Sequence, residues 1–280
     1  KLHKTVQDII NMKKEKKKIS VITSYDYTLA SLCDKAGIDV MLVGDSAGMV
    51  MLGYENTIAV TMDQMCMFTE AVSRARKSSL LVADLPFMSY QASIEDAINN
   101  SGRLIKAGAD AVKLEGGSIM AETISAIVDV GIPVMGHIGL QPQTTTLSEG
   151  YKVQGKTKDS AMKLIEDAKE LEDAGVFSIA LEMVSHEVGQ IISESVNIPT
   201  IGIGSGVNCD GQVLVVQDLL GMYDKIKPKF AKRYMNLSED IVKSLEEYRT
   251  DVESGSFPAK ENSFSMNEEE LKKLREALGS

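Results

Sequence analysis

Short apolar runs alternate with longer amphipathic stretches along most of the chain. Seven runs have the Val, Ile, Leu and Ala content of buried strands, and they cover residues 20–25, 40–44, 80–85, 111–114, 133–138, 178–183 and 200–204. A weaker eighth run at 213–216 is also compatible with a helix. Parallel strands that are buried on both faces appear as continuous apolar runs separated by helices. The alternation therefore predicts repeated parallel β/α units.

The intervening stretches carry recognisable helix boundaries. Residues suited to cap a helix N-terminus precede three of them, namely Thr61, Ser93 and Ser185. Glycine closes three helices in a repeated Lys-Ala-Gly or Asp-Ala-Gly phrase at 35–37, 106–108 and 173–175. Each glycine leads directly into a predicted strand, as expected where one β/α unit follows another.

The number of units favours a (β/α)8 TIM barrel. Seven or eight units in roughly 200 residues exceed the five or six strands usual for a doubly wound sheet. The glycine-rich GIGSG at 202–206 lacks the GxGxxG spacing of a dinucleotide site, because Val207 stands three residues after Gly204. We expect a single barrel domain over residues 1–255.

A short C-terminal tail is expected over residues 256–280. Residues 250–264 have a loop-like composition. Asn267 and Glu270 then resemble a capping box before the amphipathic sequence LKKLREAL. We expect this short helix to pack on the barrel or on a neighbouring subunit.

Net charge, apolar content and cysteine spacing limit the partners and the location that we expect for the protein. The net charge of −10 argues against nucleic acid, and we interpret the basic run at 13–18 as solvated surface. No apolar run approaches the roughly 20 residues of a membrane helix. Cys33, Cys66 and Cys209 have no metal-binding or disulfide spacing, which favours a reducing, cytoplasmic location.

Polar residues with catalytic chemistry follow the apolar runs. In chain order they are Asp45 and Ser46, Asp84, Lys113 and Glu115, His137, Glu182 and Ser205. Active sites of (β/α)8 barrels lie at the C-terminal ends of the strands, where all of these residues are expected. Side chains two apart on a strand share a face, which pairs Lys113 with Glu115, Val82 with Asp84 and Val43 with Asp45.

If those faces point into the barrel, three carboxylates and a lysine converge. Carboxylates that crowd a desolvated site repel one another, and their pKa values rise unless a cation is present. Oxygen ligands without Cys or clustered His favour Mg²⁺ or Mn²⁺ over Zn²⁺. The sequence therefore indicates a divalent metal site.

Each residue also has a structural interpretation. Asp45 or Asp84 alone could serve as a turn or cap residue, Lys113 and Glu115 as an interior salt bridge, and His137 as a hydrogen-bonded core residue. Glu182 follows apolar residues and is either a general base with a raised pKa or a buried ion-pair partner. Their shared position at one end of successive strands favours the functional interpretation.

At these residues the sequence resembles the ketopantoate hydroxymethyltransferase family. The resemblance rests on VMLVGDSAGM, LLVADLPFMSY, IKAGADAVKLEGG, GIPVMGHIGLQPQ, ALEMV and IPTIGIGSGVNCDGQ, in that order, and covers residues 20 to about 264. The family is similar to the phosphoenolpyruvate mutase and isocitrate lyase barrels. The resemblance implies transfer of a hydroxymethyl group from 5,10-methylenetetrahydrofolate to 3-methyl-2-oxobutanoate, in pantothenate and coenzyme A synthesis. It also implies a homo-oligomer, commonly a decamer.

The resemblance further implies roles for individual residues. Asp45 and Asp84 ligate Mg²⁺, through which they contact the substrate, and Glu115 joins the metal site. Ser46 and Lys113 hold the keto acid, Glu182 is the proton acceptor, and His137 faces the site without an assigned role. The chain departs from the family pattern at Gly53-Tyr54, at Ala59 and at Ser205.

Three alternatives remain open at this point. The first is a related Mg²⁺-dependent lyase acting on another 2-oxo acid, which would need no folate. The second uses Lys113 as a Schiff-base nucleophile, with a pKa lowered by burial. The third is a barrel that has lost catalysis and serves as a scaffold. The location of the folate pocket does not follow from the sequence.

Overall fold

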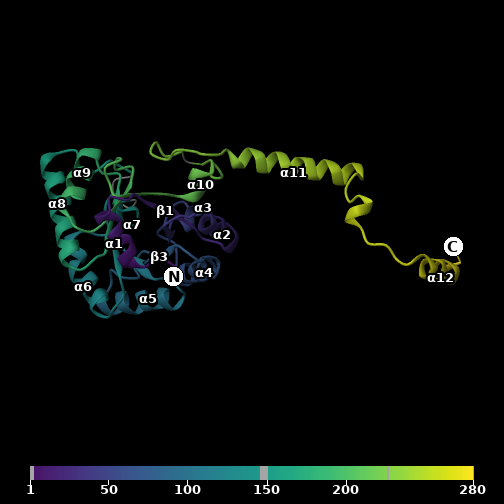
Figure 1. The fold of residues 1–280 in the computed structure, drawn as a ribbon, viewed down its shortest axis with the longest axis horizontal. Helices are drawn as coiled ribbons and strands as arrows, with labels where there is room; N and C mark the ends of the chain where they lie inside the picture. Colours follow the sequence, from purple (N-terminus) through teal and green to yellow (C-terminus); the bar gives the residue numbers. More distant parts are fainter. Residues whose placement is uncertain (1–2, 146–150, 226, 280) are drawn as a thin grey trace.

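Parallel strands close into a barrel in the computed structural model, which describes residues 3–145, 151–225 and 227–279. Neighbouring strands pair in chain order, and β1 closes the barrel against β8. The strands are β1 Ile19–Thr23, β2 Val40–Val43, β3 Leu80–Asp84, β4 Ala111–Lys113, β5 Val134–Gly139, β6 Ser178–Glu182, β7 Thr200–Ile203 and β8 Gly211–Leu214. The predicted (β/α)8 fold is therefore confirmed (Figure 1).

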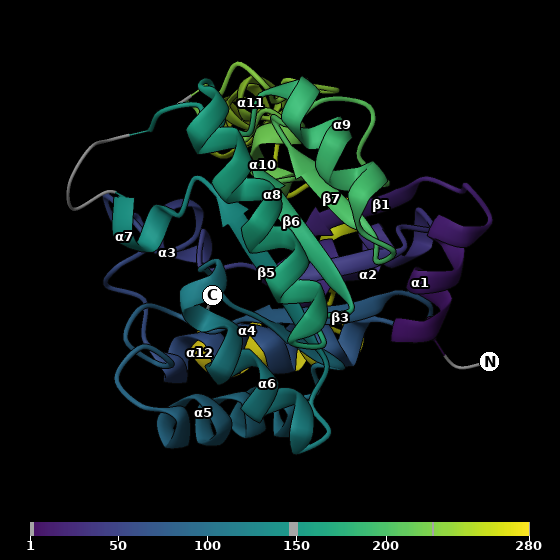
Figure 2. The same ribbon diagram turned by 90° about the vertical axis from the view of Figure 1, so that its left-hand side faces the viewer.

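Helices surround the strands, as the two ribbon views show (Figures 1 and 2). Those between β1 and β7 are α2 Tyr27–Lys35, α3 Ala47–Val50, α4 Met62–Ala75, α5 Ile94–Lys106, α6 Ala121–Asp129, α7 Pro142–Thr145, α8 Lys158–Asp173 and α9 His186–Ser195, with the 3₁₀ turn η1 Ser118–Met120. The first helix, α1 Val6–Lys14, precedes the barrel, and its Ile9 is completely buried among side chains of the barrel interior. The described helices include none long and apolar enough to cross a bilayer.

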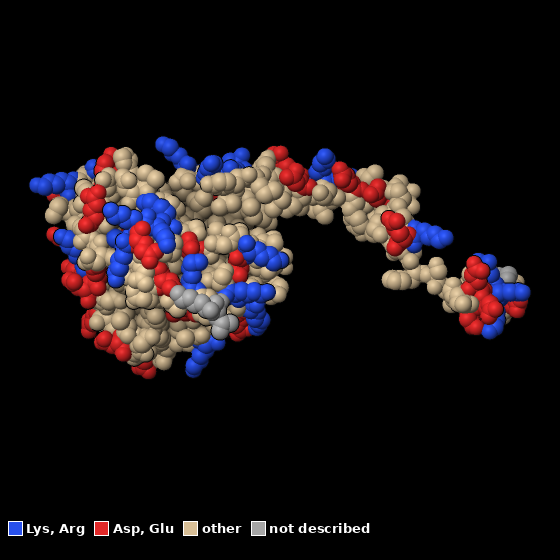
Figure 3. Space-filling model, viewed as in Figure 1, with Lys and Arg blue, Asp and Glu red and all other residues tan. Residues whose placement is uncertain are grey.

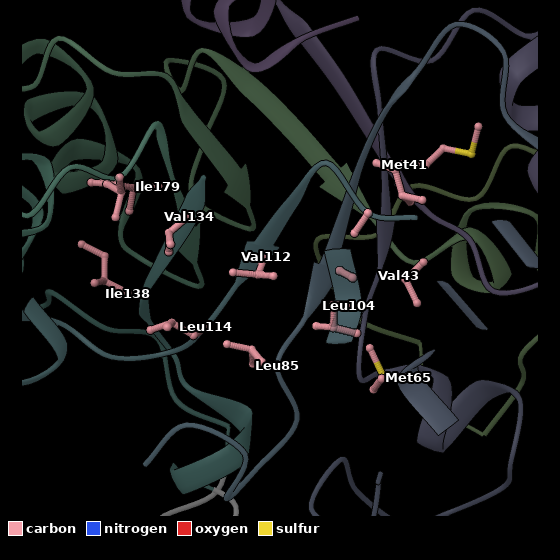
Figure 4. Close-up of a cluster of buried hydrophobic side chains, with 14 of the residues drawn as sticks. Met41, Val43, Met65, Leu85, Leu104, Val112, Leu114, Val134, Ile138 and Ile179 are labelled. Atoms are coloured by element: carbon pink, nitrogen blue, oxygen red, sulfur yellow. The ribbon is translucent and has the colours of Figure 1, made fainter. Parts of the chain in front are cut away.

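The period-two alternation of the strands divides the core into two layers. Met41, Val43, Val112 and Ile179 belong to the layer between strands and helices (Figure 4). The residues that alternate with them along the strands fill the barrel interior, among them Val40 and Leu42 of β2, Leu80 and Val82 of β3, and Ala111 of β4. Because both faces of each strand are covered, the strands appear in the sequence as unbroken apolar runs.

The predicted helix boundaries are confirmed. Thr61 caps α4 in a reciprocal capping box with Gln64, and Ser93 caps α5 by accepting from the Asp96 amide. The helix α9 begins after Ser185 as expected, although the Ser185 hydroxyl donates to the Gly155 carbonyl and caps nothing. The three predicted closing glycines have left-handed φ angles of 78°, 107° and 96° at Gly37, Gly108 and Gly175. Each completes the paired hydrogen bonds of a Schellman motif.

The C-terminal part differs from the sequence prediction. The eighth strand begins and ends two residues earlier than predicted. It ends at Leu214 because Val215 and Val216 already belong to the start of the short helix α10 Val216–Leu219. Residues 250–254 are helical and not loop-like, since they continue α11 Leu237–Ser254 until Gly255 ends it with a left-handed φ of 73°.

The chain from α11 onward extends away from the barrel (Figures 1 and 3). The helix α11 has no buried residue, and it is followed by η2 Lys260–Asn262 and α12 Glu268–Leu278. Asn267 caps α12 as predicted, by accepting from the Glu269 amide, but the capping box with Glu270 is wrong, because the Glu270 side chain pairs with Lys273. The helix α12 does not pack on its own barrel, so packing on a neighbouring subunit stays a prediction.

Candidate active site

A cavity of about 370 Å³ opens at the C-terminal ends of the strands. Its floor is formed by inward-facing apolar residues of the barrel, and its wall contains most of the polar residues predicted from the sequence. These are Asp45, Ser46, Asp84, Lys113, Glu115, His137 and Glu182. Residues from several strands thus meet at one place, as predicted.

Asp45 reaches the cavity by a different route from the one predicted. We expected it to share an inward face with Val43, but Val43 packs outward against the helices. The strand β2 ends at Val43, and the chain turns at Gly44, so the alternation of the strand no longer applies to Asp45. The Asp45 amide then donates to Asp84 Oδ2 over 3.0 Å, which fixes the turn above the cavity.

Asp84 and Lys113 form a buried ion pair between β3 and β4. The Lys113 Nζ atom lies 2.9 Å from Asp84 Oδ1, and both side chains are less than 10% exposed. Burial alone would lower the pKa of Lys113, but the negative charges of Asp84, Asp45 and Glu115 outweigh it and raise that pKa above its usual value. Lys113 is therefore an ammonium ion, whereas a Schiff-base nucleophile needs a lowered pKa.

Burial and the negative charges of the cavity raise the pKa values of Asp45 and Glu115. Burial, together with the charge of Asp84, raises the pKa of Asp45 to about 7. Burial and the charges of Asp45 and Glu182 raise the pKa of Glu115 well above its usual value, although Lys113 opposes the shift. One lysine therefore does not neutralise the group, which is the condition under which a divalent cation binds.

A buried glutamine that the sequence analysis missed joins Asp45 to Glu115. Gln143 Nε2 donates to Asp45 Oδ2 over 2.8 Å and to the Leu85 carbonyl over 3.0 Å. The Gln143 amide donates to Glu115 Oε2 over 3.1 Å. The Tyr90 hydroxyl lies 2.7 Å from Gln143 Oε1 and donates to it. A flipped side chain would place oxygen against two acceptors, so these partners fix its orientation.

His137 links Glu182 to Lys113. Its Nε2 atom lies 3.1 Å from Glu182 Oε2 and 2.9 Å from the Leu140 carbonyl. Both partners accept hydrogen bonds, which assigns a proton to Nε2. The Nδ1 atom lies 3.3 Å from Lys113 Nζ and can accept from the ammonium. His137 therefore holds the Glu182 carboxylate at the wall of the cavity.

The two serines predicted at strand ends have different positions. Ser46 lines the cavity, and its Oγ atom lies 2.7 Å from the hydroxyl of the buried Tyr25. Ser205 is buried outside the cavity wall, where its hydroxyl donates to the Leu181 carbonyl and accepts from the Val184 amide. Ser205 thus joins the ends of β6 and β7 and is not placed to touch a ligand.

The oxygen-rich wall suits a magnesium ion that keeps part of its water shell. Within residues 3–145, 151–225 and 227–279, no three His, Cys, Asp or Glu side chains converge tightly enough to enclose a metal ion by themselves. Mg²⁺ commonly takes one or two protein carboxylates and completes its octahedron with water and substrate oxygens. Asp45 and Asp84, joined through the Asp45 amide, provide such a pair.

Comparison with known proteins identifies relatives over the whole chain. The family model for ketopantoate hydroxymethyltransferase matches residues 3–260. The 3-methyl-2-oxobutanoate hydroxymethyltransferase of Nitrosopumilus maritimus (strain SCM1) is 88% identical over 279 residues, which cover 100% of both chains. The enzyme of the same name from Cenarchaeum symbiosum (strain A) is 59% identical over 91% of this chain and 96% of its own.

Solved structures with low sequence identity share the barrel. Phosphonopyruvate hydrolase, solved in complex with oxalate and Mg²⁺, has a TM-score of 0.61 at 11% identity, over 98% of this chain and 99% of its own. The 2,3-dimethylmalate lyase, a member of the phosphoenolpyruvate mutase/isocitrate lyase superfamily, has a TM-score of 0.59 at 14% identity, over 98% and 96% of the two chains. These likenesses concern the fold, whereas the sequence matches define the family. The chain belongs to the ketopantoate hydroxymethyltransferase family and is an enzyme of that family.

Proposed function

We propose that the chain transfers a hydroxymethyl group from 5,10-methylenetetrahydrofolate to 3-methyl-2-oxobutanoate. The products are ketopantoate and tetrahydrofolate, one water molecule is consumed to supply the hydroxyl oxygen, and the reaction serves pantothenate and coenzyme A synthesis. Membership of the family supports the reaction, and one observation carries the chemistry. The side chains of Asp45, Asp84, Lys113, Glu115 and Glu182 all line one cavity at the strand ends.

Mg²⁺ fits this site as the resident cation. Asp45 and Asp84 would hold it, and Glu115, which accepts a hydrogen bond from the Gln143 amide, would support it. When bound, the ion would act as a Lewis acid on the keto group and balance the negative charge that raises the pKa of Asp45 and Glu115. Lys113 and Ser46 supply hydrogen-bond donors that would orient the keto acid.

Glu182 is the proposed base that removes the proton from C3 of the keto acid. Its side chain is 17% exposed, so it reaches the cavity while the rest of β6 is buried. The His137 Nε2–H group holds the Oε2 atom of the carboxylate, and Oε1 would take up the substrate proton. The C3 carbon of the enolate formed by this step then bonds to the one-carbon unit of the folate, the bonds from that unit to the folate nitrogens break, and water supplies the hydroxyl oxygen of the product.

Glu182→Gln tests the assignment of the base. Glutamine keeps the shape and a hydrogen bond with His137 but cannot take up the proton. We expect kcat to fall about 10²- to 10⁴-fold, or about 3 to 5 kcal/mol in barrier, while the dissociation constant of the keto acid changes little. Steady-state kinetics and calorimetric titration measure the two quantities, and an unchanged kcat would remove Glu182 from the role.

A reconstitution assay tests the reaction itself. The protein is mixed with 3-methyl-2-oxobutanoate and 5,10-methylenetetrahydrofolate, with Mg²⁺ or with EDTA, and ketopantoate is measured. We expect product only when a divalent cation is present. Absence of product under every metal condition contradicts the proposed function, and turnover without folate would indicate a carbon–carbon lyase.

The enzyme is also proposed to act as a homo-oligomer in the cytoplasm. The exposed apolar side chains of α11, among them Leu245 at 61% and Tyr248 at 56% exposure, support association with a second copy. A decamer remains the expectation drawn from the family resemblance.

A further inference from the structure

Thr57 has a buried hydroxyl group that nothing in its own fold satisfies. The residue is 4% exposed and forms part of the wall of the active-site cavity, together with Gly44 and Ser46. In the described part of the chain its Oγ1 atom has no hydrogen-bond partner. Buried polar groups are nearly always paired, so a hydroxyl left unpaired beside a ligand cavity calls for a partner from the ligand.

The position of Thr57 is set by close packing of its loop on α3. Gly48 lies against the loop so tightly that a Cβ atom built on it would stand 2.5 Å from Val60 Cγ2 and 3.2 Å from Tyr54 Cδ2. The Tyr54 amide donates to the Gly48 carbonyl over 2.8 Å, and the Val60 amide donates to the Thr57 carbonyl over 3.2 Å. The loop is therefore pinned on both sides of Thr57, next to the turn that carries Ser46.

The charge of the cavity explains why a hydroxyl is needed there. A keto acid brings its own carboxylate into a wall that already contains Asp45, Asp84 and Glu115, which as carboxylates can only accept hydrogen bonds. The Lys113 ammonium already pairs with Asp84, on the β3 and β4 side of the cavity. Donors for the substrate on the β2 side must therefore come from hydroxyl or backbone groups.

We propose that Thr57 binds the 2-oxo acid substrate: its hydroxyl donates a hydrogen bond to the substrate carboxylate beside Ser46. A rotation about the Thr57 Cα–Cβ bond moves the hydroxyl between staggered positions and lets it face a bound anion. The inference rests on the proposed function, because it takes the substrate to be a 2-oxo acid. It assigns a substrate contact to the loop between α3 and α4, beyond the residues at the strand ends.

Thr57→Val tests the proposal, because valine keeps the shape and removes the hydroxyl. A hydrogen bond to a charged group is strong, so we expect the dissociation constant of 3-methyl-2-oxobutanoate in saturating Mg²⁺ to rise about 10- to 100-fold by calorimetric titration. The melting temperature of the ligand-free variant should stay equal or rise, because no internal hydrogen bond is lost. Thr57→Ser keeps the hydroxyl and should therefore keep most of the wild-type affinity for the keto acid.

Thr200→Val is the matched control for a buried threonine outside the cavity. The Thr200 hydroxyl has internal partners, lying 2.6 Å from Ser193 Oγ and 3.0 Å from Asp210 Oδ2. Its loss should lower the melting temperature and leave keto acid affinity unchanged, which is the opposite of the signature expected for Thr57→Val.

The outcomes separate this proposal from the proposed function. If the wild-type protein binds the keto acid and Thr57→Val binds it equally well, the role of Thr57 is wrong and the proposed function stands. If Thr57→Val loses stability but no affinity, the hydroxyl is structural, which also overturns the proposal. If the wild-type protein itself does not bind the keto acid, both the proposed function and the role of Thr57 fail.

Discussion

Gln143 places two carboxylates of the cavity without carrying charge itself. Its side chain and its backbone amide donate to Asp45 and Glu115, and Tyr90 fixes the orientation of the side-chain amide. Groups that orient metal ligands commonly contribute 10- to 100-fold to metal affinity. Gln143 is therefore expected to govern how well Asp45 presents its oxygens to Mg²⁺.

Gln143→Met tests this role, because methionine has a similar volume but no donor. We expect the dissociation constant of Mn²⁺, used as a spectroscopic substitute for Mg²⁺, to rise about 10- to 100-fold in electron paramagnetic resonance titrations. Gln190→Met is the control, since Gln190 is exposed on α9 and its side chain bonds Glu194 and Asn208, neither of which lines the cavity. Equal Mn²⁺ affinity in the Gln143 variant and the wild type would contradict the role.

Single residues were predictable where their chemistry was uncommon for their position. An acid or lysine in or directly after an apolar run, such as Asp84 or Lys113, is costly to bury. Its presence in the sequence therefore indicates a functional or paired residue. Gln143 in α7 and Thr57 in its loop carry no such signal, because amides and hydroxyls are ordinary in short helices and loops. Only the folded chain reveals which of them have partners, and the roles of all these residues stay predictions until tested.

At the scale of elements, patterns that depend on local chemistry were predicted most accurately. The strands and the glycine-ended helices follow from residues close together in sequence, which is why Gly37, Gly108 and Gly175 were identified correctly. The eighth strand was misplaced because Val215 and Val216 suit a strand by composition but begin α10. The domain division proposed at residue 255 falls at the glycine that ends α11.

The contact between α3 and the following loop depends on the missing side chain of Gly48. Gly48→Ala would force Val60 and Tyr54 apart from α3, at an expected cost of about 1 to 3 kcal/mol in the free energy of unfolding. Because the loop carries Thr57, keto acid affinity should fall as well. Chemical denaturation and calorimetric titration measure the two effects.

Gly102→Ala is the matched control for this substitution. Gly102 lies within α5, and a Cβ atom there would meet nothing within 4 Å. Alanine has the higher helix propensity, so the control should gain up to about 1 kcal/mol and bind the keto acid normally. A Gly48 variant that behaves like this control would disprove the close packing of the loop.

At the scale of the whole molecule, α11 presents an apolar stripe that its own barrel does not cover. Ile241, Leu245, Tyr248 and Val252 follow one another at spacings of four, three and four residues, and each is exposed. Such spacing places them along one side of a helix, as in a seam between two helices. The space-filling view shows this arm standing clear of the barrel body (Figure 3).

Leu245→Glu should dissociate the proposed oligomer. A charge in the middle of the stripe would be desolvated on association, so the molar mass from light scattering is expected to fall toward that of a single 30.4 kDa chain. Thr250→Glu adds the same charge away from the stripe and should leave the mass unchanged. A wild-type protein that is monomeric at micromolar concentration would rule out the association.

The position of α11 outside the barrel separates catalysis from subunit association, two properties that oligomeric enzymes often combine in one interface. The strand-end side chains around Asp45, Lys113 and Glu182 come from one barrel, whereas the apolar stripe lies on the arm beyond it. Diluting the enzyme should therefore leave the turnover of each subunit intact at first. If the proposed oligomer dissociates on dilution, its subunits lose protection, because a separated copy presents its stripe to proteases and to unfolded chains. Protein concentration would then affect the lifetime of a subunit more than its turnover rate.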